Sequence, residues 1–286
     1  MQQSHAKGNY ALALKEWKPL AEKGSAEEQL LIAQMYNEGL GTPQDYKQAA
    51  DWFRKAAEQG NADAQNHLGV MYKNGQGVPQ DYNKAIEWLS KAAQQGNGDA
   101  QGNLGNIYYE GGQVPRDRQQ AFYWYVKAAE QGNVNAPNMI GTMYFQGDTV
   151  SKNYKEAAGW FQMAAERGSV QAQNNICLMY TEGQGVPKND QKAAYWCRKA
   201  AEQGNANAQL GLGNMYYTGQ GVQKDIVIAY MLFNLSSASG NNNARKNRDI
   251  IYAEMTTRQI DEGNALSRTW LIGKPLPNES RTGLIR

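Results

Sequence analysis

The residue types best suited to chemistry are few in this chain and are far apart in the sequence. Cys177 and Cys197 are twenty residues apart, and the two histidines are His5 and His67. No C-x-x-C pair occurs, so the sequence predicts no zinc site, no other metal site and no cofactor. His67 has no candidate catalytic partner, which favours an ordinary surface histidine over a general base.

The two cysteines stand at positions where equivalent segments of the chain carry other residues. Cys177 replaces a glycine, and Cys197 replaces phenylalanine or leucine. We interpret both as buried free thiols, because cysteine behaves as a small apolar residue in a core. A single disulfide between them is the alternative, since both residues belong to one predicted helical hairpin.

Catalytic motifs are missing as well. Neither a phosphate-binding G-x-x-x-x-G-K-[ST] loop nor a G-x-S-x-G nucleophile turn occurs, and the carboxylates stand at predicted helix caps or outer faces. Because no base, nucleophile and metal converge, the sequence predicts that the protein is not an enzyme. A hydrolase is kept as the least favoured alternative.

Charge and hydropathy limit the kinds of partner. With 29 Lys and Arg against 27 Asp and Glu, the formal net charge of +2 is too small to favour nucleic acid. No run of eighteen apolar residues occurs, so no membrane span is predicted. The chain as given begins without an apolar signal segment. The compartment is therefore unknown, and a periplasmic or secreted location is favoured over the cytoplasm if a signal peptide was removed.

A period of 36 residues organises the chain. Three residue types mark it most clearly. Tyrosine recurs at Tyr36, Tyr72, Tyr108, Tyr144, Tyr180 and Tyr216. Glycine recurs at Gly24, Gly60, Gly96, Gly132, Gly168, Gly204 and Gly240. Tryptophan recurs at Trp52, Trp88, Trp124, Trp160 and Trp196, and its column ends at Leu232. A fixed period of this length indicates a repeat architecture.

Each period predicts two helices, as residues 61–96 illustrate. Asn61 is a good N-cap for a first helix that ends at Gly75, and a turn rich in Gly and Pro follows. Asp81 is the N-cap of a second helix that Gly96 closes. One hairpin cannot bury both of its apolar stripes, so neighbouring repeats must stack, with the tyrosine and tryptophan columns in the core.

These columns resemble the Sel-one-like repeat family, the 36-residue branch of the tetratricopeptide-type α/α solenoids. The motif A-x-x-x-L-G-x-M-Y-x-x-G-x-G-V-x-x-D-Y-x-x-A-x-x-W runs from Ala64 to Trp88. The resemblance covers roughly residues 9–272 and implies an all-α, right-handed superhelical solenoid whose first helices line a concave face. It also implies an adaptor role, often in secreted or periplasmic bacterial proteins. The cysteine-rich members pair cysteines within each repeat, but Ala57 and Gln65 stand at those positions, so no activity is carried over from that subgroup.

The period also predicts the organisation of the chain. Residues 1–24 form an incomplete repeat, in which residues 9–24 are a lone second helix. Six repeats follow, at 25–60, 61–96, 97–132, 133–168, 169–204 and 205–240. Residues 241–272 form C-terminal capping helices, and residues 273–286 form a loose tail.

The candidate binding surface consists of first-helix positions outside the buried stripe. Its predicted residues are Asn66, Val70, Asn103, Asn106, Tyr109, Asn138, Met139, Thr142, Phe145, Asn174, Asn175, Leu178, Thr181, Asn214 and Tyr217. The first-helix segments 133–146 and 205–218 contain no charged residue. Amides and aromatic rings on an uncharged wall suit an extended protein segment or a partner helix.

The sequence thus predicts a scaffold or adaptor that binds a protein or peptide in its concave groove. The alternative is an immunity or inhibitor protein that clamps a toxic enzyme. Both readings predict a protein partner, and neither predicts nucleic acid.

Overall fold

The computed structural model describes residues 10–277, and every regular element in that range is an α-helix. The chain divides into two compact units, residues 1–136 and 137–286. Unit 1 holds α2 (Tyr10–Ala21), α3 (Ala26–Glu38), α4 (Tyr46–Glu58), α5 (Ala62–Asn74), α6 (Tyr82–Gln94), α7 (Gly98–Glu110) and α8 (Arg118–Glu130). From the unit boundary onward lie α9 (Ala136–Gln146), α10 (Tyr154–Glu166), α11 (Val170–Glu182), α12 (Asp190–Glu202), α13 (Ala206–Thr218), α14 (Ile226–Ala238), α15 (Asn242–Tyr252) and α16 (Thr257–Thr269).

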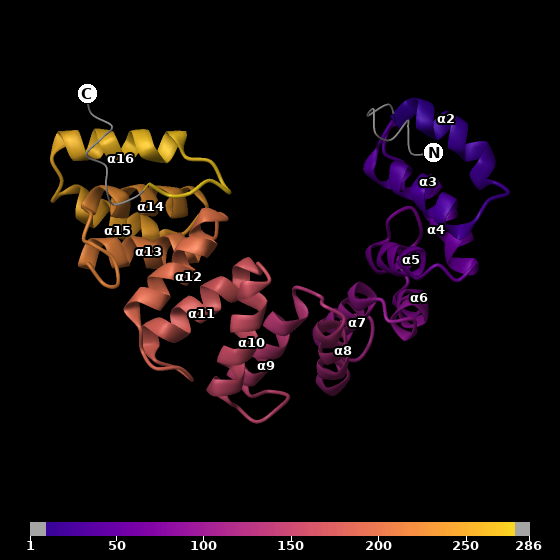
Figure 1. Ribbon diagram of the computed structural model, residues 1–286, viewed down its shortest axis with the longest axis horizontal. Coiled ribbons are helices and arrows are strands. Elements are labelled where there is room, and N and C mark those ends of the chain that lie inside the picture. The colour runs from indigo at the N-terminus through magenta and orange to yellow at the C-terminus, as the bar shows by residue number, and fades with distance from the viewer. Residues whose placement is uncertain (1–9, 278–286) are drawn as a thin grey trace. The chain divides into compact units, whose positions relative to one another are not determined.

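Within each unit, helices that follow one another in the sequence pack side by side (Figure 1). In unit 1, α3 packs on α4, α5 on α6 and α7 on α8, and in unit 2, α11 packs on α12 and α13 on α14. The predicted all-α solenoid of helical hairpins is confirmed. Residues 1–9 of the predicted incomplete repeat lie outside the described residues.

The predicted caps explain where the helices begin and end. Asn61 accepts a hydrogen bond from the Ala64 amide at 2.9 Å, and Asp81 accepts one from the Lys84 amide at 3.0 Å. Gly75 ends α5 in the left-handed conformation, with φ of 69°. These side-chain acceptors satisfy amides that have no partner within the helix, so each helix starts at a fixed residue.

In four hairpin turns, one glycine is required by a close approach: Gly41, Gly77, Gly185 and Gly221. Gly77 has φ of 69°, and a Cβ atom there would lie 2.0 Å from the Tyr46 carbonyl oxygen at the start of α4. No other residue fits both the backbone angle and the space. The turn of one repeat therefore rests directly on the second helix of the repeat before it.

Glutamine side chains join consecutive repeats. Gln65 Nε2 donates to the Ala57 carbonyl at the end of α4 at 3.1 Å, and Gln65 Oε1 accepts from Gln95 Nε2 at 2.8 Å. The same donation to a carbonyl eight residues earlier is made by Gln29, Gln101, Gln173 and Gln209. Each buried amide satisfies a carbonyl at a helix end, which fixes how far one hairpin is rotated against the next. Pro137 stands at this position in α9 and has no side-chain amide.

The two helices of a hairpin touch through a pair of residues twenty positions apart. On the first helix the residue is small, and on the second it is large and fully or nearly fully buried: Gly69 with Leu89, Gly105 with Tyr125, Gly141 with Phe161, and Gly213 with Phe233. A Cβ atom added to these glycines would lie 2.6–2.7 Å from the partner side chain. Close helix contact therefore depends on the missing side chain.

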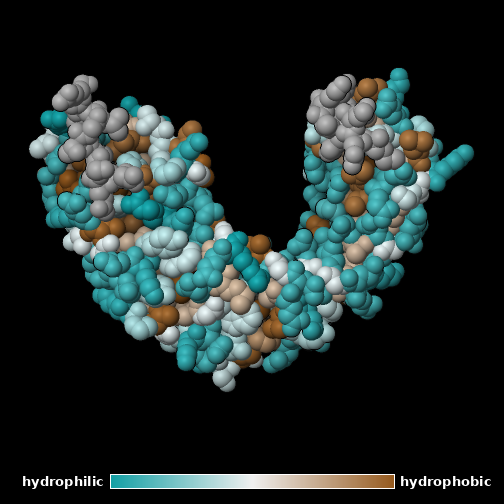
Figure 2. All heavy atoms as spheres, in the orientation of Figure 1, coloured by the Kyte–Doolittle hydropathy of each residue, from teal (hydrophilic) through white to brown (hydrophobic). Residues whose placement is uncertain are grey.

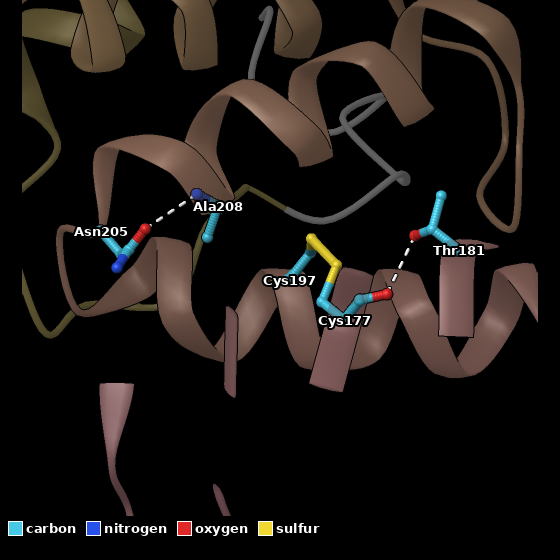
Figure 3. The surroundings of a disulfide bond; sticks show 5 residues. All are labelled: Cys177, Thr181, Cys197, Asn205 and Ala208. Atoms are coloured by element: carbon cyan, nitrogen blue, oxygen red, sulfur yellow. Dashed lines mark hydrogen bonds between the residues drawn. A yellow bond between two sulfur atoms is a disulfide. The ribbon is translucent and has the colours of Figure 1, made fainter. Parts of the chain in front are cut away.

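Cys177 and Cys197 occupy this pair of positions in the fifth repeat, and they form a disulfide (Figure 3). The interpretation of both as free thiols is wrong, and the alternative is confirmed. Both residues are buried, and their Cα atoms are 5.3 Å apart. The twenty-residue spacing brings these two positions into contact in four other hairpins, so two cysteines placed there lie within bonding distance.

The aromatic columns are only partly buried, which corrects the expectation that all of them lie in the core. Buried members are Tyr36, Tyr72, Tyr180, Tyr216, Trp52 and Trp196, and half-buried members are Tyr108, Tyr144, Trp88, Trp124 and Trp160. The deepest side chain of the second helix is the one after the tryptophan position, such as Phe53. Neighbouring positions on a helix differ by about 100° in direction, so the tryptophans lie at the margin of the buried stripe.

The segment after α16 is not loose over residues 273–277, contrary to the prediction. The Gly273 amide donates to the Glu202 carbonyl oxygen at 2.7 Å, and the Leu276 amide donates to the Glu202 carboxylate at 3.0 Å. The Leu276 side chain is buried. The C-terminus of α12 has carbonyl groups without helical partners, and the Gly273 amide supplies a donor for one of them. The remainder of the predicted tail lies outside the described residues.

Two glycines in helices of unit 2 give a matched test of the close contact. In Gly213→Ala a methyl group would lie 2.6 Å from the buried Phe233 ring, and we expect a loss of about 1–3 kcal/mol of unfolding free energy. Gly159→Ala enters open space on α10 and should gain up to about 1 kcal/mol from helix propensity. Urea unfolding followed by circular dichroism measures both. Shifts of the same sign would contradict this packing.

The disulfide can be exchanged for the contact that other hairpins use. We expect reduction to lower the unfolding free energy of the wild type by about 2–4 kcal/mol. The double variant Cys177→Gly/Cys197→Phe recreates the Gly213 and Phe233 pair, so its unfolding midpoint should not respond to dithiothreitol. A wild-type midpoint that is the same with and without reductant would show that the disulfide does not stabilise the fold.

Candidate protein-interaction surface

A pocket of about 280 Å³ opens in unit 2 on the first-helix side. It is formed by α9, α10, α11 and the turn that follows α11, and we call it the α9–α11 pocket. Its lining residues are Thr142, Phe145, Gln146, Phe161, Asn175, Leu178, Met179, Glu182 and Gln184. The wall is mainly apolar, with amide and hydroxyl groups among the aromatic rings and one carboxylate.

Local contacts hold the walls of this pocket in place. Phe161 fits against Gly141 of α9, as in the other hairpins. The Phe145 ring packs on the Tyr154 ring, with centroids 5.1 Å apart. Asn175 Nδ2 of α11 donates to Asn138 Oδ1 of α9 at 3.1 Å, and this bond ties the two first helices together. The pocket is therefore preformed.

Leu178 is the exposed apolar residue of the pocket. Its side chain is 47% exposed, whereas Met179 beside it is buried. A partner that covers this leucine removes its apolar area from water, and this burial favours binding. Apolar groups also occur among the hydrophilic groups on the visible surfaces of both units (Figure 2).

Four of the predicted binding residues line this pocket: Thr142, Phe145, Asn175 and Leu178. The other predicted residues do not line this pocket. Asn66, Val70, Asn103, Asn106 and Tyr109 belong to unit 1, and the others belong to unit 2.

The predicted asparagine ladder is used inside the protein, which corrects its reading as a row of free amides. Asn103 donates to Asn66 at 2.9 Å, and Asn247 donates to Asn214 at 2.8 Å, as Asn175 does to Asn138. Asn66 is buried and not exposed. These pairs link neighbouring first helices, so their amide groups are already satisfied.

Other predicted residues also have internal partners. Asn106 Oδ1 accepts a hydrogen bond from the Tyr125 hydroxyl at 2.8 Å, and burial raises the pKa of that hydroxyl above its ordinary value. Thr181 Oγ1 donates to the Cys177 carbonyl at 2.9 Å (Figure 3), and the Tyr217 hydroxyl donates to Glu254 at 2.8 Å. Val70 packs against the core of unit 1. Met139 and Asn174 are half-buried.

Sequence reasoning missed five lining residues of the pocket: Gln146, Phe161, Met179, Glu182 and Gln184. Phe161 and Met179 belong to columns that read as core, and both are buried, yet one side of each faces the pocket. Glu182 lies 36 residues after Gln146, in one of the columns assigned to the surface, and both line the pocket. The position of Glu182 in a surface column of the repeat was therefore the one feature of the sequence that could have identified it as a lining residue.

Unit 1 carries a pocket in the same register. It measures about 280 Å³ and is lined by Tyr10, Trp17, Leu31, Gln34, Met35, Glu38 and Leu40. Trp17, Met35 and Glu38 lie 144 residues before Phe161, Met179 and Glu182, which is four periods. An aromatic ring, a methionine and a glutamate thus recur together in both units.

No group of three or more His, Cys, Asp and Glu side chains that could hold a metal ion is found between residues 10 and 277. A search of the same residues finds no helix with the length and hydropathy needed to cross a membrane.

His67 is half-buried and stacks on Phe53 at a centroid distance of 4.8 Å, so its prediction as a surface histidine is wrong. The His67 side chain faces α4, the second helix of the preceding repeat.

Six consecutive segments match the Sel1 repeat: residues 29–61, 62–97, 98–133, 136–169, 170–205 and 206–241. The chain belongs to the Sel1 repeat family. Sel1 repeats generally mediate protein–protein interactions, and the family is generally a non-catalytic scaffold. These segments start one to four residues after the predicted repeat starts.

Two solved Sel1 repeat structures are similar to this chain. One is a protective antigen of uropathogenic Escherichia coli strains with an SLR fold, which is 39% identical with a TM-score of 0.85. The match covers 92% of this chain and 56% of that protein, so this chain spans little more than half its length. The other is a Sel1 repeat protein from Oxalobacter formigenes, with 32% identity, a TM-score of 0.72, and coverage of 82% and 94%. Comparison with curated proteins gave no match.

His67 should make the stability of this Sel1 repeat protein depend on pH. Burial lowers the pKa of its imidazole below the ordinary 6.5, although Asp63, Glu38 and Asp99 partly offset the effect. The unfolded chain then binds a proton more readily than the folded one, so stability is full above about pH 6.5 and falls as the pH drops toward the folded pKa. We expect the urea midpoint to fall more between about pH 7.5 and about pH 5.5 in the wild type than in His67→Gln. Equal slopes would contradict this assignment.

Proposed function

We propose that this chain is a protein-interaction scaffold of the adaptor type, which binds a protein or peptide on the first-helix side of unit 2. The α9–α11 pocket anchors the partner. The observation that carries this proposal is an exposed leucine, Leu178, in a preformed pocket between two tied helices. Membership of a family of interaction repeats supports it.

The size of the pocket favours a side chain over a small molecule. At about 280 Å³ it lies at the lower limit of the roughly 300–1,000 Å³ typical of small-molecule sites. One or two apolar side chains fill such a space, and anchors of this kind carry most of the binding energy of an interface. The uncharged α9 segment beside it lets a peptide backbone approach without desolvating a charge.

The disulfide supports an exported site of action. Disulfides persist in oxidising compartments such as the periplasm and the cell exterior. Cys177 and Cys197 are paired and buried, so the bond is part of the core. We therefore propose that the partner is met in the periplasm or outside the cell.

Site-specific photo-crosslinking in the native host tests the proposal. A benzophenone amino acid replaces Leu178, and the matched control replaces Tyr195, an exposed residue on the second helix of the same repeat. We expect an adduct with one protein from Leu178 in the periplasmic or secreted fraction, and none from Tyr195. No adduct from either position, or the same adducts from both, would contradict a partner at the pocket.

The same experiment addresses the immunity or inhibitor alternative. If the crosslinked protein is an enzyme that this chain binds with nanomolar affinity and inactivates, the chain is an inhibitor and not an adaptor. A partner that keeps its activity in the complex supports the adaptor.

A further inference from the structure

A carboxylate recurs at the C-terminal ends of first helices, and the chain itself shows what this carboxylate binds. Glu110, the last residue of α7, forms an ion pair with Lys73 Nζ of α5 at 3.3 Å. Glu254, just after α15, accepts a hydrogen bond from the Tyr217 hydroxyl of α13 at 2.8 Å. In both pairs the donor lies 37 residues earlier, on the preceding first helix. In each unit, therefore, a carboxylate at this position of the repeat is bound by a donor from the preceding first helix of the same chain.

Glu182 lies in the same column, but its internal donor is missing. The residue 37 positions earlier is Phe145, whose ring cannot donate a hydrogen bond to a carboxylate. Within the described part of the chain, no hydrogen bond or ion pair reaches the Glu182 side chain. Nearby cations are engaged elsewhere, because Lys188 lies 3.8 Å from Asp190 and Lys152 lies over the Tyr154 ring.

The replacement of a donor by Phe145 thus changes two things at one place. It leaves the Glu182 carboxylate unpaired, and it adds an aromatic wall to the α9–α11 pocket that both residues line. An apolar cavity and a single negative charge lie side by side. Since α9 carries no charge, Glu182 is the one charged group of the lining.

We infer that the partner segment carries a lysine or arginine next to a large apolar side chain. The inference rests on the proposed function of the pocket. The apolar side chain fills the space between Phe145, Phe161 and Leu178, and the cation pairs with Glu182 as Lys73 pairs with Glu110. An acidic segment is disfavoured by repulsion from the same carboxylate.

The two parts of this motif contribute differently. Glu182 is exposed, so the ion pair is screened by water and contributes modestly to affinity. Its main effects are selectivity and dependence on salt concentration. The apolar side chain supplies most of the binding energy because it removes the exposed Leu178 surface from water.

Selection of short random peptides displayed on phage, with the purified protein as the target, tests the inference. The variants are Glu182→Lys, which reverses the charge, and Phe145→Lys, which supplies an internal ammonium group as Lys73 does. Glu166→Lys on α10 is the matched control, because it reverses an exposed charge of the same unit outside the pocket. Circular dichroism and melting midpoints verify that all variants fold.

We expect the wild type to enrich peptides with a lysine or arginine next to a large apolar residue. A synthetic peptide of that sequence should bind Glu182→Lys roughly 3- to 10-fold more weakly at low salt, and the loss should shrink as salt is added. Changing the peptide's basic residue to glutamate should restore binding to Glu182→Lys. Phe145→Lys should weaken binding, and Glu166→Lys should leave it unchanged.

Two results would overturn the inference, and they differ in what they say about the proposed function. Enriched peptides that lack a basic residue, or that bind Glu182→Lys as tightly as the wild type but lose affinity in Phe145→Lys, would refute the cation and leave the pocket as the anchor. Peptides whose affinity is changed by neither Glu182→Lys nor Phe145→Lys, or no enrichment at all, would refute the inference and the proposed function together.

Discussion

Close contact between the two helices of each hairpin is the constraint on which the structure depends. A residue with little or no side chain on the first helix faces a large residue twenty positions later, as Gly105 faces Tyr125. This contact lets both helices bury small residues such as Ala85 along their whole length. The Cys177–Cys197 disulfide occupies the same two positions, so a covalent bond replaces packing in one repeat.

Function in this design comes from small departures from the repeat. Phe161 meets Gly141 on one side and the α9–α11 pocket on the other, so one ring serves both the hairpin and the surface. Elsewhere a first-helix donor such as Lys73 pairs with a glutamate of the next repeat. At position 145 that donor is replaced by a phenylalanine, whose ring lines the α9–α11 pocket. The proposed binding site therefore needs no change in the backbone plan.

The sequence predicted the features that depend on one repeat alone. The caps at Asn61 and Asp81 and the left-handed Gly75 follow from local chemistry, and the period gives the hairpin and its stacking. The burial of the tryptophan column was overestimated. Its position lies about 100° from the centre of the buried stripe, where neighbouring side chains decide whether a residue is buried or half-buried. Cys177 and Cys197 were wrongly interpreted as free thiols, with a disulfide only as the alternative, because spacing along a chain does not give a distance.

The binding surface was predicted less well, because it depends on how repeats stack. Thr142, Phe145, Asn175 and Leu178 were found by their column positions, and they meet in one pocket. Predicted asparagines such as Asn66 and Asn103 form hydrogen bonds with each other across neighbouring first helices. Whether they meet depends on how far one first helix is shifted along the next. Glu182 was missed because a charged residue on a surface column looks ordinary until its missing donor is known.

Methyl NMR spectroscopy tests most directly whether Phe145 leaves an open apolar space. Met179 lines the pocket, and Met71 stands at the same column in unit 1, where Lys73 and Glu110 are paired. Titration with N-acetylphenylalanine amide should shift the methyl signals of Leu178 and Met179 in a saturable way and leave Met71 unchanged. Equal shifts at Met71 and Met179, or none at either, would contradict the account.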